Sequence, residues 1–230
     1  MGSSNFGVWR SLVAYLVWDQ GVQGSNPCTP TNNMIIIDNA FSESMFKKIQ
    51  EEILGFGFDW HYGRRVNEDD GSNENSFLIG WVHVVAGWES EQKFTPELYS
   101  LIESELSKVL TNNNEPCGEI IRVRIVCNTT ADKSYITQPH VDCDYTHQTV
   151  LFYINDADGD TIIYNEKFKP GLGIESVQLC RAIKHKLTIK AEIKPKANRL
   201  VIFNGLHYHS GTTPTESDRR VVMNINYKLT

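Results

Sequence analysis

The chain has 230 residues, of which 40% are hydrophobic and 10% are aromatic, and its formal net charge at pH 7 is −6. This length and composition suffice for one domain with a sizeable core. The acidic balance provides no global basic field, so we expect neither nucleic acid nor a membrane surface as a partner. No apolar run reaches the length of a membrane span.

The cysteines are few and scattered, with no CxxC pair and no regular spacing. An odd, irregular set is typical of reduced thiols rather than of a disulfide framework. We therefore expect a cytoplasmic protein. The set consists of Cys28, Cys117, Cys127, Cys143 and Cys180.

Residues 1–33 differ from the rest of the chain. Their apolar run, Leu12 to Val17, is short and follows only one positive charge, which is not the pattern of a secretory signal. The peptide Gly24 to Pro27 is what GGTTCGAATCCC encodes, a sequence common in the T-arm of transfer RNA genes. We expect residues 1–33 to be a non-native or disordered extension translated from such a gene, with the natural start at Met34. The alternative is a genuine disordered or strand-adding arm.

The chain from Met34 begins with a short apolar run, Ile35–Ile37, which predicts a buried strand. Ser42 is a suitable N-cap for a helix that continues to about Leu54. The preceding Phe41 and the following Phe46 have the spacing of a hydrophobic staple. These features predict a first helix after the strand.

The second helix is predicted to start at Thr95-Pro96, because proline is favoured at the first helical position. Between the helices, the acidic and polar segment Val66–Ser76 predicts a loop, and Phe77–Val85 predicts a strand. The apolar positions of the second helix fall on one face of a 3.6-residue period. They are Leu98, Leu101, Ile102, Leu106, Val109 and Leu110.

After the second helix, the pattern changes to short strands separated by turn signals such as Asp158-Gly159 and Pro170-Gly171. Two helices followed by many strands predict a mainly β domain, a sandwich or barrel backed by helices. The predicted strands are Ile120–Cys127, Gln148–Ile154, Thr161–Tyr164, Leu187–Ile193, Leu200–Phe203 and Arg220–Tyr227.

Among these strands stands His140-Val141-Asp142. In an extended strand the side chains of His140 and Asp142 point to the same side, close enough to hold one ion. One imidazole and one carboxylate are two of the three ligands in the two-histidine, one-carboxylate triad that binds non-haem Fe(II). The motif alone is weak, since H-x-D occurs by chance in many chains, and the third ligand must come from elsewhere.

Further motifs follow in a set order, and together they are far more specific than any one alone. After His140-x-Asp142 come Tyr153-Ile154-Asn155, Asp158-Gly159 with Thr161, a strand ending in Phe203, His209-Ser210-Gly211 and Arg220. This arrangement resembles the iron(II)/2-oxoglutarate-dependent oxygenases, in their prolyl 4-hydroxylase-like branch, over roughly residues 119–229 and less closely from Met34.

The resemblance implies a double-stranded β-helix, jelly-roll or cupin-like, with the two helices packed on one sheet and residues 34–230 forming a single dioxygenase domain. It implies that His140, Asp142 and His209 bind Fe(II). Arg220 would pair with the distal carboxylate of the cosubstrate 2-oxoglutarate, helped by Tyr153 and, as a looser match, by a hydroxyl from Thr161. Dioxygen would take the remaining position at the iron.

Spacing leaves two choices open. His207 and His209 share one face if their segment is extended, and the family's His-small-Gly order favours His209. Arg219 competes with Arg220, and the family's Arg-hydrophobic-x-hydrophobic-Asn spacing favours Arg220.

The resemblance implies hydroxylation of a C–H bond, with 2-oxoglutarate converted to succinate and CO2. The substrate, either a small molecule or a peptide, is not readable, and neither is the oligomeric state. Peptidyl proline, an amino acid and a small metabolite all fit. Substrate contacts are expected on the loops Val66–Ser76, Thr129–Gln138 and Lys167–His185.

Three other functions compete. A cupin-like metal enzyme that does not use 2-oxoglutarate would need the triad but neither Arg220 nor Tyr153. A non-catalytic β-sandwich binding module would need none of these residues. Nucleic-acid demethylation within the same superfamily is disfavoured by the acidic balance. It is also disfavoured by Asn226, because those enzymes have a second arginine six residues after the first.

Overall fold

The structure is a computed structural model that describes residues 34–63, 80–87, 94–170 and 185–229. The predictions for residues 1–33 and for the loop Val66–Ser76 lie outside these ranges, as does most of the predicted loop Lys167–His185. The proposed N-terminal extension therefore stays a prediction.

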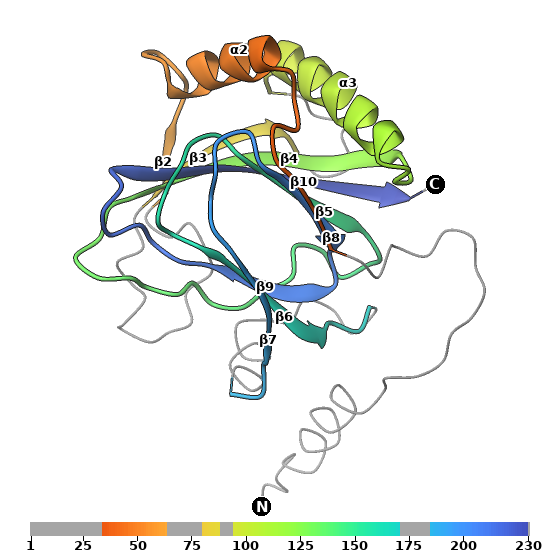
Figure 1. Cartoon of the computed structure of the whole chain (residues 1–230), viewed down its shortest axis with the longest axis vertical. Coiled ribbons are helices and arrows are strands. Elements are labelled where there is room, and N and C mark those ends of the chain that lie inside the picture. Colours follow the sequence, from red (N-terminus) through yellow and green to blue (C-terminus); the bar gives the residue numbers. More distant parts are fainter. Residues whose placement is uncertain (1–33, 64–79, 88–93, 171–184, 230) are drawn as a thin grey trace, which may run out of the picture.

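The described chain forms a large antiparallel sheet and a small one, which face each other (Figure 1). The large sheet has seven strands and the small one has three, with β10 at the centre of the large sheet and β6 at the centre of the small one. In spatial order the large sheet contains β1 (Ile35–Ile37), β8 (Leu200–Asn204), β5 (Gln148–Tyr153), β10 (Arg219–Leu229), β4 (Gly118–Thr129), β3 (Gly80–Ala86) and β2 (His61–Gly63), and the small sheet contains β7 (Ile189–Ile193), β6 (Thr161–Lys167) and β9 (His207–Gly211).

Both described helices, α2 (Glu43–Leu54) and α3 (Pro96–Asn112), lie on the outer face of the large sheet (Figure 1). Their apolar faces share one core with the outward side chains of β4, β5, β8 and β10. The staple residues Phe41 and Phe46 both pack against the ring of Phe152 on β5, with ring centroids 4.5 and 5.9 Å away. The predicted helices and their packing on one sheet are therefore confirmed.

A second apolar cluster fills the space between the two sheets, because the inward side chains of the large sheet meet those of β6 and β7 there. Its buried members are Val126, Leu151, Tyr153, Ile163, Ile193, Val201, Phe203 and Val222. This two-sheet core confirms the predicted jelly-roll architecture.

The structure qualifies one expectation for local structure and contradicts another. Ser42 is the N-cap of α2, as predicted, and its carbonyl accepts from the backbone of Phe46 at 2.8 Å, but its hydroxyl makes no capping bond. The segment His140–Asp142 is not part of a regular strand, since His140 forms only an isolated bridge to His209 and Asp142 lies in a bend. The short strands β2 and β9 were not predicted. Neither described helix is long and apolar enough to span a membrane.

Candidate functional site

His140, Asp142 and His209 converge between the sheets, with one potential ligand atom from each lying within 4.8 Å of the others. The backbones of His140 and His209 exchange two hydrogen bonds of 3.0 and 2.9 Å, which hold the two imidazole centroids 4.5 Å apart. His209 Nε2 lies 3.7 Å from Asp142 Oδ2. Pairing with β9, rather than alternation along one strand, therefore brings the three side chains together.

Both imidazoles are oriented by backbone carbonyls. His140 Nδ1 donates to the carbonyl of Gln138 at 3.0 Å, and His209 Nδ1 donates to that of His207 at 3.2 Å. The Nε2 atoms are left for the centre of the cluster, and that of His209 is buried without a hydrogen-bond partner among the described residues. Burial lowers the pKa of His140 to about 4 and also lowers the pKa of His209, so both rings are neutral and each offers a lone pair.

Asp142 is held in its ionised form by a set of donors. Burial raises its pKa, but the positive charge of Arg122 and hydrogen bonds bring the pKa well below its usual value. Oδ1 accepts a bond of 2.7 Å from Arg122, while Oδ2 accepts one of 2.9 Å from Asn226 and faces His209. The amide of Asn224 contacts both oxygens. The carboxylate is thereby fixed with Oδ2 toward the imidazoles.

The donor set fits a metal. Two neutral imidazole nitrogens and one carboxylate oxygen on one side of a centre are the ligands of a non-haem Fe(II) site with open positions. The buried, unpaired Nε2 of His209 is an orphaned polar atom of the kind that a metal would satisfy.

A second polar cluster surrounds Arg220, whose side chain is buried. Its Nη2 donates to the hydroxyl of Thr161 at 2.7 Å, and its Nε donates to the carbonyl of Gly159 at 2.7 Å. The hydroxyl of Thr161 also accepts from Tyr153 at 2.7 Å, and the guanidinium carbon lies 5.8 Å from the centre of the Tyr153 ring. Three residues predicted for cosubstrate binding thus lie in one cluster.

Two motif residues fix the position of Arg220. The amide of Asn155 accepts a 2.8 Å bond from the backbone of Val221 and donates one of 2.8 Å to the carbonyl of Arg219, so it holds the chain on both sides of Arg220. At Gly159 a Cβ atom would lie 2.5 Å from the carbonyl of Thr212 and 3.0 Å from Arg220 Cδ. Only glycine allows this close approach.

One narrow cavity joins the two clusters. Its walls come from both sheets. Along β4 and β10 the paired lining residues run from Arg124 and Asn224, through the apolar pair Val126 and Val222, to Asn128 and Arg220. The lining residues are Arg124, Val126, Asn128, Thr137, His140, Leu151, Thr161, His209, Ser210, Gly211, Arg220, Val222 and Asn224.

His207 and His209, and likewise Arg219 and Arg220, lie in different surroundings in the structure. His207 lies outside the triad, where Nδ1 donates to the carbonyl of Tyr164 and Nε2 lies 3.2 Å from Lys190 Nζ. Two residues separate His207 from His209, as two separate His140 from Asp142, so spacing does not exclude it. Both of its ring nitrogens face these other groups, and His207 is not in the cluster whose ligand atoms lie within 4.8 Å of one another. Arg219 is exposed and borders a surface hollow beside Trp60 and Trp81, whereas Arg220 is buried.

Sequence reasoning missed the polar residues of the large sheet that face the triad: Arg122 and Arg124 on β4, and Asn224 and Asn226 on β10. A signal was present, because two arginines at alternate positions interrupt the otherwise apolar stretch Ile120–Val126. Such residues on the inner face of a central strand indicate a polar site rather than packing.

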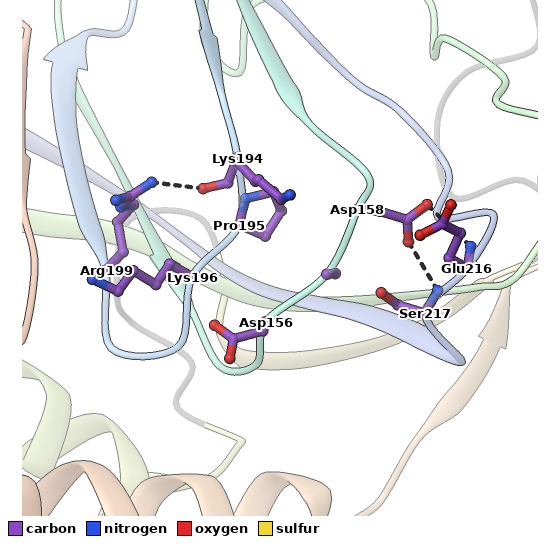
Figure 2. Close-up of a pocket in the computed structure, with 9 residues that line it drawn as sticks. Asp156, Asp158, Lys194, Pro195, Lys196, Arg199, Glu216 and Ser217 are labelled. Carbon is purple, nitrogen blue, oxygen red and sulfur yellow. Dashed lines mark hydrogen bonds between the residues drawn. The ribbon is translucent and has the colours of Figure 1, made fainter.

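Figure 2 shows another pocket, of about 430 Å³, lined by charged residues such as Asp158, Arg199 and Glu216. Several of its charged groups already have partners within the chain: Asp158 accepts from the backbone of Ser217, and Arg199 donates to the carbonyl of Lys194. Asp38 also pairs with Arg199 and Lys196. Because these groups satisfy one another, the triad cavity is the better candidate for a functional site.

No protein-family model matches the sequence, and no curated protein matches it. Solved structures do match. A prolyl hydroxylase from Trichoplax adhaerens, in complex with a peptide fragment of hypoxia inducible factor, is 16% identical, with a TM-score of 0.54 and coverage of 86% of this chain and 84% of that one.

Two enzymes of nogalamycin biosynthesis also match over a similar share of this chain. The non-haem alpha-ketoglutarate-dependent epimerase SnoN is 10% identical, with a TM-score of 0.59 and coverage of 86% of this chain and 78% of that one. The carbocyclase SnoK is 13% identical, with a TM-score of 0.58 and coverage of 86% and 79%. The chain has the fold of 2-oxoglutarate-dependent oxygenases. At these identities the likeness establishes the double-stranded β-helix and leaves the activity to the site.

Proposed function

We propose that the chain is an Fe(II)- and 2-oxoglutarate-dependent dioxygenase that hydroxylates its substrate and releases succinate and CO2. The observation that carries this proposal is the cavity lined by His140 and His209 of the metal triad at one end and by the buried guanidinium of Arg220 at the other. A metal-binding triad alone would fit many enzymes. A buried arginine facing it adds a binding point for a second carboxylate.

Each residue has a role in this proposal. His140, Asp142 and His209 would hold Fe(II), and Arg122 would keep one oxygen of Asp142 away from the metal. Arg220, with the hydroxyls of Thr161 and Tyr153, would bind the distal carboxylate of 2-oxoglutarate and so orient its other end toward the metal. When bound, Fe(II) and 2-oxoglutarate supply the activation of dioxygen. The apolar wall between the two ends would exclude water from the reacting groups.

The substrate is either a peptide, such as one containing proline, or a small molecule, such as an amino acid or another metabolite. Both kinds have a precedent on this fold, since the Trichoplax hydroxylase was solved with a peptide fragment and SnoN with Fe3+, alpha ketoglutarate and the small molecule nogalamycin RO. The epimerase and carbocyclase activities of SnoN and SnoK indicate that the fold alone does not select hydroxylation.

Anaerobic titration tests the proposal. Protein loaded with Fe(II) should develop a visible charge-transfer absorbance when 2-oxoglutarate is added, and admission of oxygen with a substrate should release succinate. Arg220→Ala should lose the absorbance at the same 2-oxoglutarate concentration. Protein that binds Fe(II) but shows neither signal would contradict the proposal and favour a cupin-like metal enzyme. Protein that binds no metal would favour a non-catalytic binding module.

A further inference from the structure

Arg124 lies on the inner face of β4, two residues after Arg122. It is paired in register with Asn224 of β10 and with Val84 of β3, and it lines the same cavity as His140 and His209. The position is on the opposite side of β10 from Tyr153, so Arg124 is separate from the cluster around Arg220. No motif in the sequence assigns it a role.

The side chain of Arg124 makes no hydrogen bond or ion pair with the described residues. Its Nε atom is fully buried without a hydrogen bond, although the side chain as a whole is half-buried because part of it faces the cavity. The two other inward arginines differ. Arg122 binds Asp142 at 2.7 Å, and Arg220 donates to Thr161 and Gly159.

A buried guanidinium without a partner is unfavourable for the folded chain, because it loses water and gains nothing in return. The pKa of Arg124 is lowered by burial and by the neighbouring charge of Arg122, and the charge of Asp142 offsets this only in part. An anion bound to the guanidinium would offset this unfavourable burial.

The charges around the cavity support an anion at this position. Arg122 and Asp142 form an ion pair, so Arg124 and Arg220 leave two positive charges on the cavity wall without a carboxylate partner among the described residues. Adding Fe(II) and the dianion 2-oxoglutarate contributes two positive and two negative charges. The excess of positive charge is therefore unchanged, and Arg220 accounts for only one of the two guanidinium groups.

We propose that Arg124 is a second anion-binding residue of the cavity and that it binds a carboxylate group placed beside the metal position. This inference rests on the proposed function. The carboxylate has two possible sources: the 1-carboxylate of 2-oxoglutarate, next to the keto group, or an acidic group of the primary substrate. The planar guanidinium can meet either one with two parallel hydrogen bonds.

Binding to the Mn(II)-loaded full chain tests the cosubstrate as the source. Dissociation constants are measured for 2-oxoglutarate and for 2-oxobutyrate, which has the 1-carboxylate and keto group but no distal carboxylate. If Arg124 binds the 1-carboxylate, Arg124→Gln should weaken both ligands by about 10- to 100-fold, the size expected for hydrogen bonds to a charged group. Arg124→Lys should weaken them less.

Acetate tests the primary substrate as the source. In the complex with Mn(II) and 2-oxoglutarate, acetate held beside the paramagnetic metal should show a broadened methyl proton signal. If Arg124 binds an acidic group of the substrate, Arg124→Gln should remove most of this broadening and leave both 2-oxo acids unaffected. Arg219→Gln is the matched control, because it removes the same charge from an exposed neighbour of the site and should change neither measurement.

Thermal unfolding of the apo protein separates ligand binding from a structural role. Arg124→Gln should unfold at the wild-type temperature or above, since it removes an unpaired buried charge. A marked loss of stability, or failure to fold in both Arg124→Gln and Arg124→Lys, would overturn the inference, as would wild-type values in both binding measurements. Wild-type protein that binds neither Mn(II) nor 2-oxoglutarate would instead contradict the proposed function.

Discussion

The two ends of the cavity are built on opposite electrostatic principles. At the metal end, the carboxylate of Asp142 receives donors from Arg122, Asn224 and Asn226, so its charge is matched by protein groups. At the far end, the guanidinium of Arg220 donates to the neutral oxygens of Gly159 and Thr161, and it forms no ion pair with a carboxylate in the described part of the chain.

The difference indicates whether the charges at each end of the cavity are matched before the ligand binds or only afterwards. A matched carboxylate can hold its ligand geometry before the metal arrives, and this preorganisation strengthens metal binding. A buried guanidinium with only neutral partners gains its full stabilisation when a carboxylate binds. Substitutions at the metal end should therefore affect folding and metal affinity, whereas substitutions at the far end should affect cosubstrate affinity.

The largest effect is expected for the triad. Replacing His140, Asp142 or His209 with alanine should abolish turnover and weaken Fe(II) binding by more than the roughly 10- to 100-fold loss typical of residues that only support a ligand. Anaerobic metal titration measures it. His207→Ala is the control and should keep iron binding and measurable activity, because His207 contacts Lys190 instead. Loss of iron in His207→Ala but not in His209→Ala would reverse the choice of ligand.

Arg122→Met should lower the free energy of unfolding of the apo protein by about 3–5 kcal/mol, because it leaves the charge of Asp142 buried without its cation. Urea denaturation with and without Mn(II) measures this loss. Added metal should restore part of the stability, since the cation takes over the role of Arg122. Arg124→Met on the same strand is the matched control and should cost little. Equal losses in the two variants would contradict the difference between a paired and an unpaired arginine.

Arg220→Ala should leave iron binding nearly intact and raise the 2-oxoglutarate Km, with a loss of about 2–5 kcal/mol for a desolvated carboxylate without its partner. Arg220→Lys should recover only part, because one ammonium cannot replace the two-donor fork. Steady-state kinetics with varied 2-oxoglutarate measure the change. Arg219→Ala should do little, because that side chain is exposed. If neither arginine matters, the cosubstrate assignment fails.

The smallest effect is expected for Tyr153→Phe. The hydroxyl of Tyr153 donates to Thr161, which also receives Arg220, so its loss loosens the cluster without removing a charge. We expect a rise in the 2-oxoglutarate Km equivalent to about 1–3 kcal/mol, the range for one hydrogen bond to a charged group. A loss as large as that of Arg220→Ala would mean that the phenol, rather than the guanidinium, dominates carboxylate binding.

Local patterns were sufficient for much of the fold. The 3.6-residue period predicted the helix that the structure places at Pro96–Asn112, and alternating apolar runs predicted β4, β5, β6, β7, β8 and β10 near their observed bounds. Short-range sequence carries this information because side chains repeat with the period of their own element. The segment containing His140 is different, because a single bridge to His209 carries no periodic signal.

The sequence alone determined the types of residue at the site and their order: a histidine and an aspartate two residues apart, a distal histidine, and an arginine near the C-terminus. It did not determine which of two candidates points inward, since His207 and His209, like Arg219 and Arg220, differ mainly in direction. It also gave no motif for Arg122 and Arg124, whose meaning depends on β4 lying beside β10. Direction and strand neighbourhood are set by register between segments about 100 residues apart, where Arg122 meets Asn226, and contacts across such separations leave no local pattern in the chain.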